Sequence, residues 1–203
     1  MRQVPSDIAF TDSVKAIQSE KGSRRGYAQM ETGKGWETTV TPALAQFLAV
    51  LDMFYLGTSN SAGQPYIQYR GGPAGFLKVI DDRTLGFADF AGNRQYISLG
   101  NISENHKAFI FLMDYATRQR VKLWGSARVV ENDPMLIQKL QDPAYSGKPE
   151  RVILFTLEAW DANCPQHIHQ RVLTAQVGPV IQQLERRVRE LESELAKARD
   201  DRV

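Results

Sequence analysis

The stretch MFYLGTSNSAGQPYIQYR, residues 53–70, decides the fold class. Its two ends, MFYLGTS and PYIQYR, are short and rich in β-branched and aromatic residues, and the turn signal NSAGQ separates them. Further runs of this kind follow as far as Trp160, divided by GGPAG, DDRT and DYATRQ. Six or seven strands with few long helices among them predict an antiparallel barrel or sandwich, and therefore a mainly β (α+β) protein.

Short helical patterns flank these strands. Thr41 as N-cap and Pro42 at the first helical position predict a helix start. SVKAIQSEKG predicts a short helix that ends at Gly22, SRRGYAQMETGKGW looks irregular, and DPMLIQKL predicts a short helix before the last strand. We therefore expect an N-terminal helical and irregular arm over residues 1–40, a barrel over 41–172 and a C-terminal amphipathic helix over 173–203.

The C-terminal segment has the pattern of a coiled coil. We expect one helix after Gly178-Pro179. Its apolar positions are spaced three and four residues apart, with Ile181, Val188 and Leu195 at a and Leu184, Leu191 and Ala198 at d. Branched a residues with leucine at d favour a parallel pair, in which Arg187 faces Glu192 and Glu194 faces Arg199. An amphipathic helix lying on its own barrel is the alternative.

Composition excludes several classes of function. A net charge of +2 is too small to indicate binding to nucleic acid or to a membrane surface. Cys164 is the only cysteine, so no internal disulfide can form, which fits a reducing compartment. The N-terminus has no apolar signal region and no stretch approaches 18 apolar residues. These features predict a cytoplasmic protein.

The stretch FADFAGNRQYIS, residues 87–98, predicts a strand followed by a helix, with a glycine, an amide and a guanidinium at the junction. Free backbone N–H groups and the positive end of a helix dipole at such a junction suit an anion. In the earlier strand YIQYR, alternation places Gln68 and Arg70 on one face and Tyr69 on the other.

Three other sets of residues have side chains that could bind a ligand or take part in catalysis. Arg118, Arg120 and Lys122 occupy every second position of one predicted strand and share a face with Trp124. Such a face suits either an anion site or a solvated sheet surface. Cys164, His167 and His169 are compatible with zinc but lack an obvious further ligand cluster, so we expect no metal. No motif in the sequence joins Asp114, Glu158 and Asp161 into an acid–base pair, and we assign them no catalytic role.

The run from Phe54 to Glu131 resembles the flavin-binding domain of the pyridoxamine 5′-phosphate oxidase-like proteins. The most specific matches are GQPYIQ, FADFAGNRQ, the GNIxxN turn (Gly100 to Asn105) and NCPQHI, the last of which resembles a predicted flavin-nucleotide-binding branch. The resemblance covers about residues 40–172. It implies a six- to seven-stranded antiparallel split β-barrel and a homodimer with FMN at the subunit interface.

The resemblance also implies roles for individual residues. Asn93, Arg94 and Gln95 stand where the oxidases place a Ser-Arg-Lys triplet on the FMN phosphate; of these only Arg94 is retained. The other residues implied to contact the cofactor are Gln68, Tyr69, Arg70, Ala88, Asp89 and, from the second subunit, Arg120. Gln166 and His167 are expected on the substrate side, and no catalytic residue is assigned.

The function so implied is an FMN-dependent oxidoreductase that moves hydride or electrons between a small organic substrate or NAD(P)H and the flavin. The segment with which the oxidases hold pyridoxine phosphate differs here, so that substrate is not carried over. Two alternatives remain: a flavin-binding module used as a sensor or store, and a split barrel that binds haem or a deazaflavin.

Overall fold

A computed structural model describes residues 4–163 and 165–200 of the chain. The chain divides into two compact units, and each is described by itself. The first consists of Met1–Asp114 and Gln119–Pro165, and the second of Tyr115–Arg118 and Gln166–Val203. The division into segments 1–40, 41–172 and 173–203 as separate domains stays a prediction.

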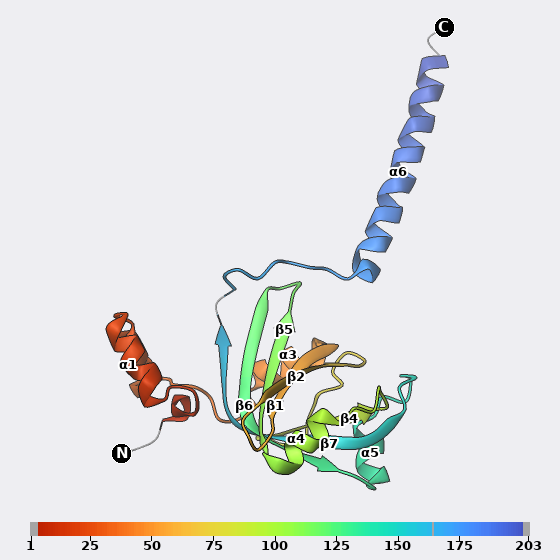
Figure 1. Cartoon of the computed structure of the whole chain (residues 1–203). Helices are drawn as coiled ribbons and strands as arrows, with labels where there is room; N and C mark the ends of the chain where they lie inside the picture. The colour runs from red at the N-terminus through yellow and green to blue at the C-terminus, as the bar shows by residue number, and fades with distance from the viewer. Residues whose placement is uncertain (1–3, 164, 201–203) are drawn as a thin grey trace. The chain divides into compact units, whose positions relative to one another are not determined.

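The first unit is built on one antiparallel sheet of seven strands, in the order β2-β1-β5-β6-β7-β4-β3 (Figure 1). This confirms the predicted mainly β class and the strand number. The strands are β1 (Met53–Ser59), β2 (Pro65–Gly71), β3 (Lys78–Val79), β4 (Thr84–Phe90), β5 (Lys107–Asp114), β6 (Gln119–Val130) and β7 (Pro149–Asn163).

The sheet curls into a split barrel around a single main core. β1 and β4 are separated by three strands in the sheet order, yet the rings of Phe54 on β1 and Phe87 on β4 meet edge to face with their centroids 5.1 Å apart. Among the described residues no backbone pairing joins β2 to β3 or β4, so the barrel stays open between these strands. The curl therefore brings β2 and β4 to face each other across the opening.

A β-bulge in β6 contributes to this curvature. The register between β6 and β7 shifts between Trp124 and Gly125, and a bulge bends and twists its strand. A Cβ atom at Gly125 would lie 2.1 Å from the carbonyl oxygen of Thr156. Only glycine fits here, because the two backbones approach too closely for any side chain.

The helices of the first unit close the barrel and extend its N-terminal side. They are the 3₁₀ helix η1 (Pro5–Ile8) and the α-helices α1 (Asp12–Glu20), α2 (Arg24–Thr32), α3 (Pro42–Val50), α4 (Ile97–Glu104) and α5 (Pro134–Leu140). As predicted, the Thr41 hydroxyl accepts a hydrogen bond from the backbone N–H of Leu44 (3.3 Å), and Pro42 begins α3.

Helix α4 is tied to the strands that it covers by three side-chain hydrogen bonds. Ser98 donates to Gln68 on β2 (2.8 Å). Asn101 donates to the buried hydroxyl of Thr58 on β1 (3.0 Å), and Asn105, just after the helix, donates to the hydroxyl of Ser59 (2.8 Å). The N-terminal end of α4 is thereby held beside β2.

Three local predictions were wrong. Residues Arg24–Thr32 form α2, although the segment looked irregular, because Arg24 holds Glu31 two turns away (Nη1–Oε1 3.0 Å) and also donates to Gln18 on α1. Residues Gly100 to Glu104 belong to α4 and not to a turn, because Asn101 turns inward to Thr58.

The third wrong boundary is that of the C-terminal helix. α6 (Thr174–Asp200) begins before Gly178-Pro179 and contains Pro179. Pro179 is the sixth residue of α6, where it removes one backbone hydrogen bond and sets its ring against the carbonyl four residues back, and the helix continues through it.

The N-terminal arm lies against the outer face of the sheet. The Trp36 and Trp124 rings stack with centroids 4.6 Å apart and planes 16° from parallel. Lys122 lies over Trp124 at 5.2 Å and forms an ion pair with Asp161 (3.4 Å). The strand face that suited either an anion site or a solvated surface therefore carries an internal aromatic and ionic contact. No helix within residues 4–163 and 165–200 has the length and apolar character needed to cross a bilayer.

Candidate functional site: a buried arginine pocket

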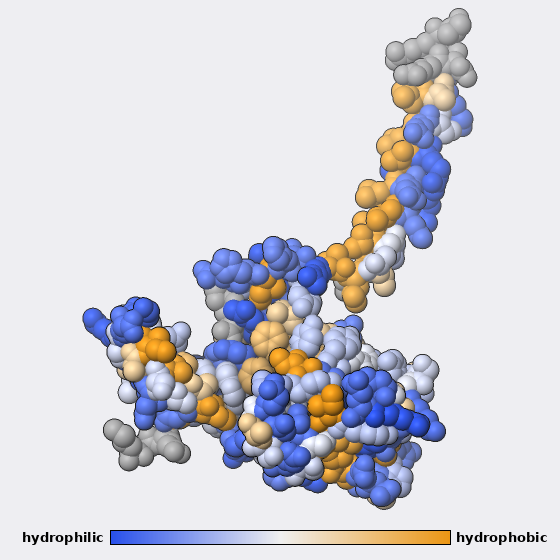
Figure 2. Space-filling model, in the orientation of Figure 1, coloured by the Kyte–Doolittle hydropathy of each residue, from blue (hydrophilic) through white to orange (hydrophobic). Residues whose placement is uncertain are grey.

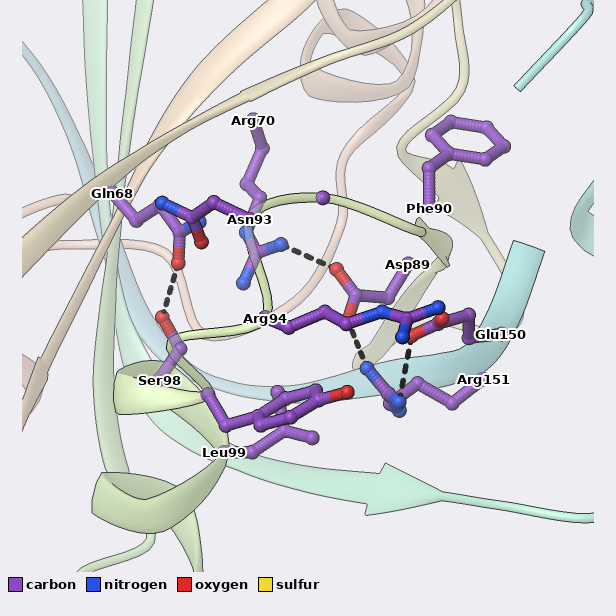
Figure 3. A pocket seen from close by; sticks show the side chains of 12 residues that line it. Gln68, Arg70, Asp89, Phe90, Asn93, Arg94, Ser98, Leu99, Glu150 and Arg151 are labelled. Carbon is purple, nitrogen blue, oxygen red and sulfur yellow. Dashed lines mark hydrogen bonds and ion pairs between the residues drawn. The ribbon is translucent and has the colours of Figure 1, made fainter. Parts of the chain in front are cut away.

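A polar pocket lies where β2 and β4 face each other across the opening of the barrel (Figure 3). The β4–α4 loop, the first turn of α4 and the start of β7 complete its wall. The residues that line it are Gln68, Arg70, Asp89, Phe90, Gly92, Asn93, Arg94, Tyr96, Ser98, Leu99, Glu150 and Arg151. Three arginines and two carboxylates among them leave one net positive charge.

The centre of the pocket is a carboxylate shared by two arginines. Asp89 forms an ion pair with Arg70, and its other oxygen accepts from Nη1 of Arg151 (3.3 Å), as Figure 3 shows. The side chains are largely buried, with 4% of Asp89 and 12% of each arginine exposed. Arg151 is held further by Glu150 (2.8 Å) and lies 3.4 Å from Glu131.

Strand register explains this convergence. Asp89 on β4 is the direct cross-strand neighbour of Arg151 on β7. On β2, the alternation of side chains turns Gln68 and Arg70 to the pocket and leaves Tyr69 58% exposed on the opposite face. Asp89 and Arg151 therefore meet because their strands are paired, whereas Arg70 on β2 reaches Asp89 across the unpaired opening of the barrel.

In the part of the chain that the structure describes, each buried arginine has an Nε donor without a hydrogen bond, although Nε of Arg151 lies 3.4 Å from Oε1 of Glu131. Nε of Arg70 and Nε of Arg151 are both buried, and neither makes a hydrogen bond within the described residues. Burial lowers the pKa of Arg70, and the nearby Asp89 only partly offsets this. Burial acts in the same direction on Arg151, but the hydrogen bond and charge of Asp89, with the charges of Glu150 and Glu131, raise its pKa overall. Buried donors without partners are costly, so this site suits an added acceptor.

The rim of the pocket is the loop between β4 and α4. Asn93 and Arg94 are exposed there, and the side-chain Oδ1 of Asn93 accepts a hydrogen bond from the backbone N–H of Gln95 (3.3 Å). Arg94 and Tyr96 have φ values of +61° and +55°, in the left-handed region that side chains other than glycine rarely occupy. The Tyr96 ring lies 5.5 Å from the Arg151 guanidinium. The predicted strand-to-helix junction is present, and α4 starts directly at the pocket.

The structure brings together five of the predicted cofactor residues and separates the other four. Gln68, Arg70, Asp89, Asn93 and Arg94 line the pocket. Tyr69 faces outward, Ala88 is buried (3% exposed), Gln95 is exposed beside the rim, and Arg120 is half-buried at one end of β6. The cofactor roles of all nine stay predictions.

The predicted substrate-side residues belong to the second compact unit. Gln166 and His167 are exposed there, and His167 has a φ of +62°. Within the described residues, no group of three or more His, Cys, Asp or Glu side chains has the arrangement of a metal site. The zinc alternative also involved Cys164, which lies outside the described residues.

Sequence reasoning missed Arg151 and Glu150, the two charged residues that β7 contributes. The signal available was the charged pair Glu150-Arg151 directly before the apolar run VILF. It was too weak to use, because nothing in the sequence shows that Arg151 is paired with Asp89. Ser98, which holds Gln68, was also missed.

Comparisons with known proteins bear on the fold and the family. The family model described as pyridoxamine 5′-phosphate oxidase matches residues 40–164, more than half of the chain. HupZ of Group A Streptococcus is 18% identical with a TM-score of 0.50, and the match covers 65% of this chain and 99% of HupZ. An FMN-binding protein of Syntrophomonas wolfei is 12% identical with a TM-score of 0.49, over 72% and 97% of the two chains. No curated protein matches significantly in sequence.

Proposed function

This chain belongs to the pyridoxamine 5′-phosphate oxidase family, and from that premise we propose that it binds FMN with the phosphate in the pocket of Arg70, Asp89 and Arg151. A phosphomonoester carries about −1.5 to −2 charges at neutral pH and offers strong acceptor oxygens. The pocket has a positive excess, unused buried donors and a helix N-terminus at its edge. The fit between these two sets of properties supports the proposal.

The observation that carries the proposal is that the buried Nε atoms of Arg70 and Arg151 make no hydrogen bond within the described residues; Nε of Arg151 has only the 3.4 Å ion pair with Glu131. An ion pair that existed only to stabilise the barrel would gain by satisfying these donors or by replacing the whole cluster with apolar side chains. Arg70 and Arg151 share Asp89, and with Arg94 the residues that line the pocket carry three positive and two negative charges. An anion at the pocket mouth supplies the missing countercharge.

Each pocket residue then has a distinct task. Arg94 and Asn93 at the rim donate directly to the phosphate oxygens, and the first N–H groups of α4 add further donors. Arg70 and Arg151 provide positive charge beneath the phosphate, and Asp89 fixes the orientation of both. Gln68, held by Ser98 (2.8 Å), is directed toward the ring system. Bound FMN would supply the redox chemistry, in which the flavin ring accepts and returns a hydride.

We place the cofactor at a homodimer interface. The outward face of β2 supports this, because Ile67 is 69% and Tyr69 is 58% exposed. Ile67 also lines an apolar groove with Phe109 on β5 and Trp124 on β6. Large apolar side chains gathered on one sheet face are typical of protein interfaces. Arg120, outside the pocket of its own chain, would reach the cofactor of the second copy.

The proposed activity is that of an oxidoreductase that passes hydride or electrons between NAD(P)H or a small organic substrate and FMN. Gln166 and His167 would select that substrate. A second candidate is a flavin-binding module without turnover. The observation that favours it is that both carboxylates of the pocket, Asp89 and Glu150, are engaged by arginines and therefore do not serve as acid–base groups.

Absorbance spectroscopy followed by a reductant screen tests the proposal. The purified protein, alone or after addition of FMN, should show the two broad bands of a bound flavin. Anaerobic NADH or NADPH should bleach them within seconds if the protein is an oxidoreductase. A stable flavin spectrum would support the module instead. A Soret band, a deazaflavin spectrum or failure to bind FMN at all would contradict the proposed cofactor.

A further inference from the structure

Helix α6 carries one continuous apolar stripe, which Figure 2 shows as a line of hydrophobic residues beside a hydrophilic face. The stripe repeats every seven residues, at spacings of three and four. Its members are 46–61% exposed in the chain: Ile181, Leu184, Val188, Leu191 and Leu195. Water contact along such a stripe is unfavourable, so a covering partner would stabilise the helix.

The surface of α6 has a hollow that could accept one side chain of a partner helix. This hollow on the stripe is lined by Ile181, Leu184, Glu185 and Val188, with Arg189 at its border. The first four occupy positions i, i+3, i+4 and i+7, which is the four-residue hole that accepts one knob of a partner helix in a coiled coil. In a parallel pair with matched ends, the knob at this level is Leu184 of the second copy.

The charges beside the stripe distinguish the two directions of pairing. In a parallel pair, Arg187 at g faces Glu192 at e of the other helix, and Glu194 faces Arg199. The side chains of Ala198 and Arg199, both part of the predicted heptad, lie outside the described residues. Each contact occurs twice by symmetry, and all four join opposite charges.

An antiparallel pair that keeps the same apolar layers is less favourable. It would place Glu185 of each helix beside Glu192 of the other, which brings like charges together twice. Its remaining flanking contacts join Arg187 to Glu194. In the single helix, Arg187 already reaches Glu190 (3.1 Å) and Glu194 (3.8 Å). These exposed contacts are weak and do not prevent pairing.

We propose that α6 pairs in parallel and in register with α6 of a second copy of this chain. The pairing rests on the homodimer of the proposed function, because about three heptads are too short to associate strongly alone. The dimeric barrel would hold the two helices at high local concentration, as linked binding modules do. The paired C-terminal helices would thus form a second subunit interface, separate from the flavin pocket.

Disulfide cross-linking of the full chain tests the direction of pairing. Leu184→Cys is placed in a Cys164→Ser background, so that the introduced thiol is the only one. In a parallel pair the two thiols at residue 184 face each other, and mild oxidation should link nearly all of the protein as dimers. Ser193→Cys is the matched control, because residue 193 faces away from the seam and should remain mostly unlinked.

The cross-linking results separate the direction of helix pairing, helix pairing itself and dimer formation. In an antiparallel pair residue 184 faces residue 195, so two copies of residue 184 lie about 16 Å apart; Leu184→Cys would then link only when mixed with Leu195→Cys, which would overturn the parallel direction. Absence of any link in a protein that is dimeric by light scattering would overturn helix pairing but leave the barrel dimer. A monomer would overturn both. FMN binding, measured on the same samples, shows separately whether the pocket proposal holds.

Discussion

Neutralising Asp89 should destabilise the protein far more than neutralising an exposed carboxylate. Asp89 is 4% exposed and, within residues 4–163 and 165–200, is the only carboxylate paired with Arg70. Arg151 retains Glu150 at 2.8 Å and Glu131 at 3.4 Å after the change. Asp89→Asn therefore leaves one buried guanidinium without a countercharge.

The expected loss follows from that geometry. Removing one partner of a buried ion pair costs about 3–5 kcal/mol. Because Arg151 keeps two carboxylates, we expect the lower end, about 3 kcal/mol, which is a large part of a typical stability of about 5–15 kcal/mol. With a urea m-value of about 2 kcal/mol/M, the midpoint should fall by about 1.5 M.

Urea unfolding followed by tryptophan fluorescence and circular dichroism measures this loss. Glu158→Gln is the matched control, since Glu158 pairs with Lys107 at 2.8 Å but the two side chains are 33% and 68% exposed. That change should cost less than about 1 kcal/mol. If Asp89→Asn cost no more than Glu158→Gln, the description of Asp89 as the buried countercharge of the pocket would be wrong.

Three further changes test other parts of the structure. Gly125→Ala should destabilise the barrel by about 3 kcal/mol or prevent folding, because its Cβ would lie 2.1 Å from a carbonyl oxygen. The control is Gly100→Ala in α4: a Cβ there would have no neighbouring atom within 4 Å, so the change should stabilise the protein by up to about 1 kcal/mol. Hydrogen bonds from the backbone and hydroxyl of the β1–β2 turn lower the pKa of Glu104. Its contribution is therefore full above its unfolded pKa and is lost as pH falls through the lower folded pKa, and Glu104→Gln should remove that part of the acid slope in urea midpoints. Arg187→Glu should weaken the dimer in sedimentation, whereas Arg186→Glu, the same charge change at the outward-facing f position, should not.

Each of these expectations has an outcome that contradicts it. A Gly125→Ala variant as stable as the parent would show that the bulge tolerates a side chain. An unchanged acid slope in Glu104→Gln would remove any role for its hydrogen bonds. Equal effects of the changes at residues 187 and 186 would indicate that only net charge matters for the C-terminal helix.

The sequence was sufficient for features that depend on neighbouring residues. Alternation along PYIQYR placed Gln68 and Arg70 on one face, and the side chain of Thr41 with Pro42 marked the start of α3. The strand-to-helix junction at Asn93 was also predictable, because a glycine and an amide interrupt an apolar run there. Local patterns thus located the rim of the pocket.

Features that depend on distant contacts were not predictable. Arg151 joins the pocket only because β7 pairs with β4 in the register that sets it opposite Asp89. Helix α2 depends on contacts made by Arg24 with Glu31 and with Gln18 of another helix, and it lacks a strong apolar stripe of its own. Such contacts arise from strand register and tertiary packing, which no short stretch of sequence records.

The central claim, that the arginine pocket holds a flavin phosphate, is tested most directly by comparing the affinities of FMN and riboflavin, which differ only in that phosphate. Two charge-assisted hydrogen bonds, from Arg94 and Asn93, at about 1.5 kcal/mol each correspond to about a hundredfold in affinity. Fluorescence-quenching titrations should therefore show FMN binding at least about 100-fold more tightly than riboflavin, with the difference falling to about tenfold in Arg94→Ala. Equal affinities for the two flavins, or a difference that Arg94→Ala leaves unchanged, would contradict the account.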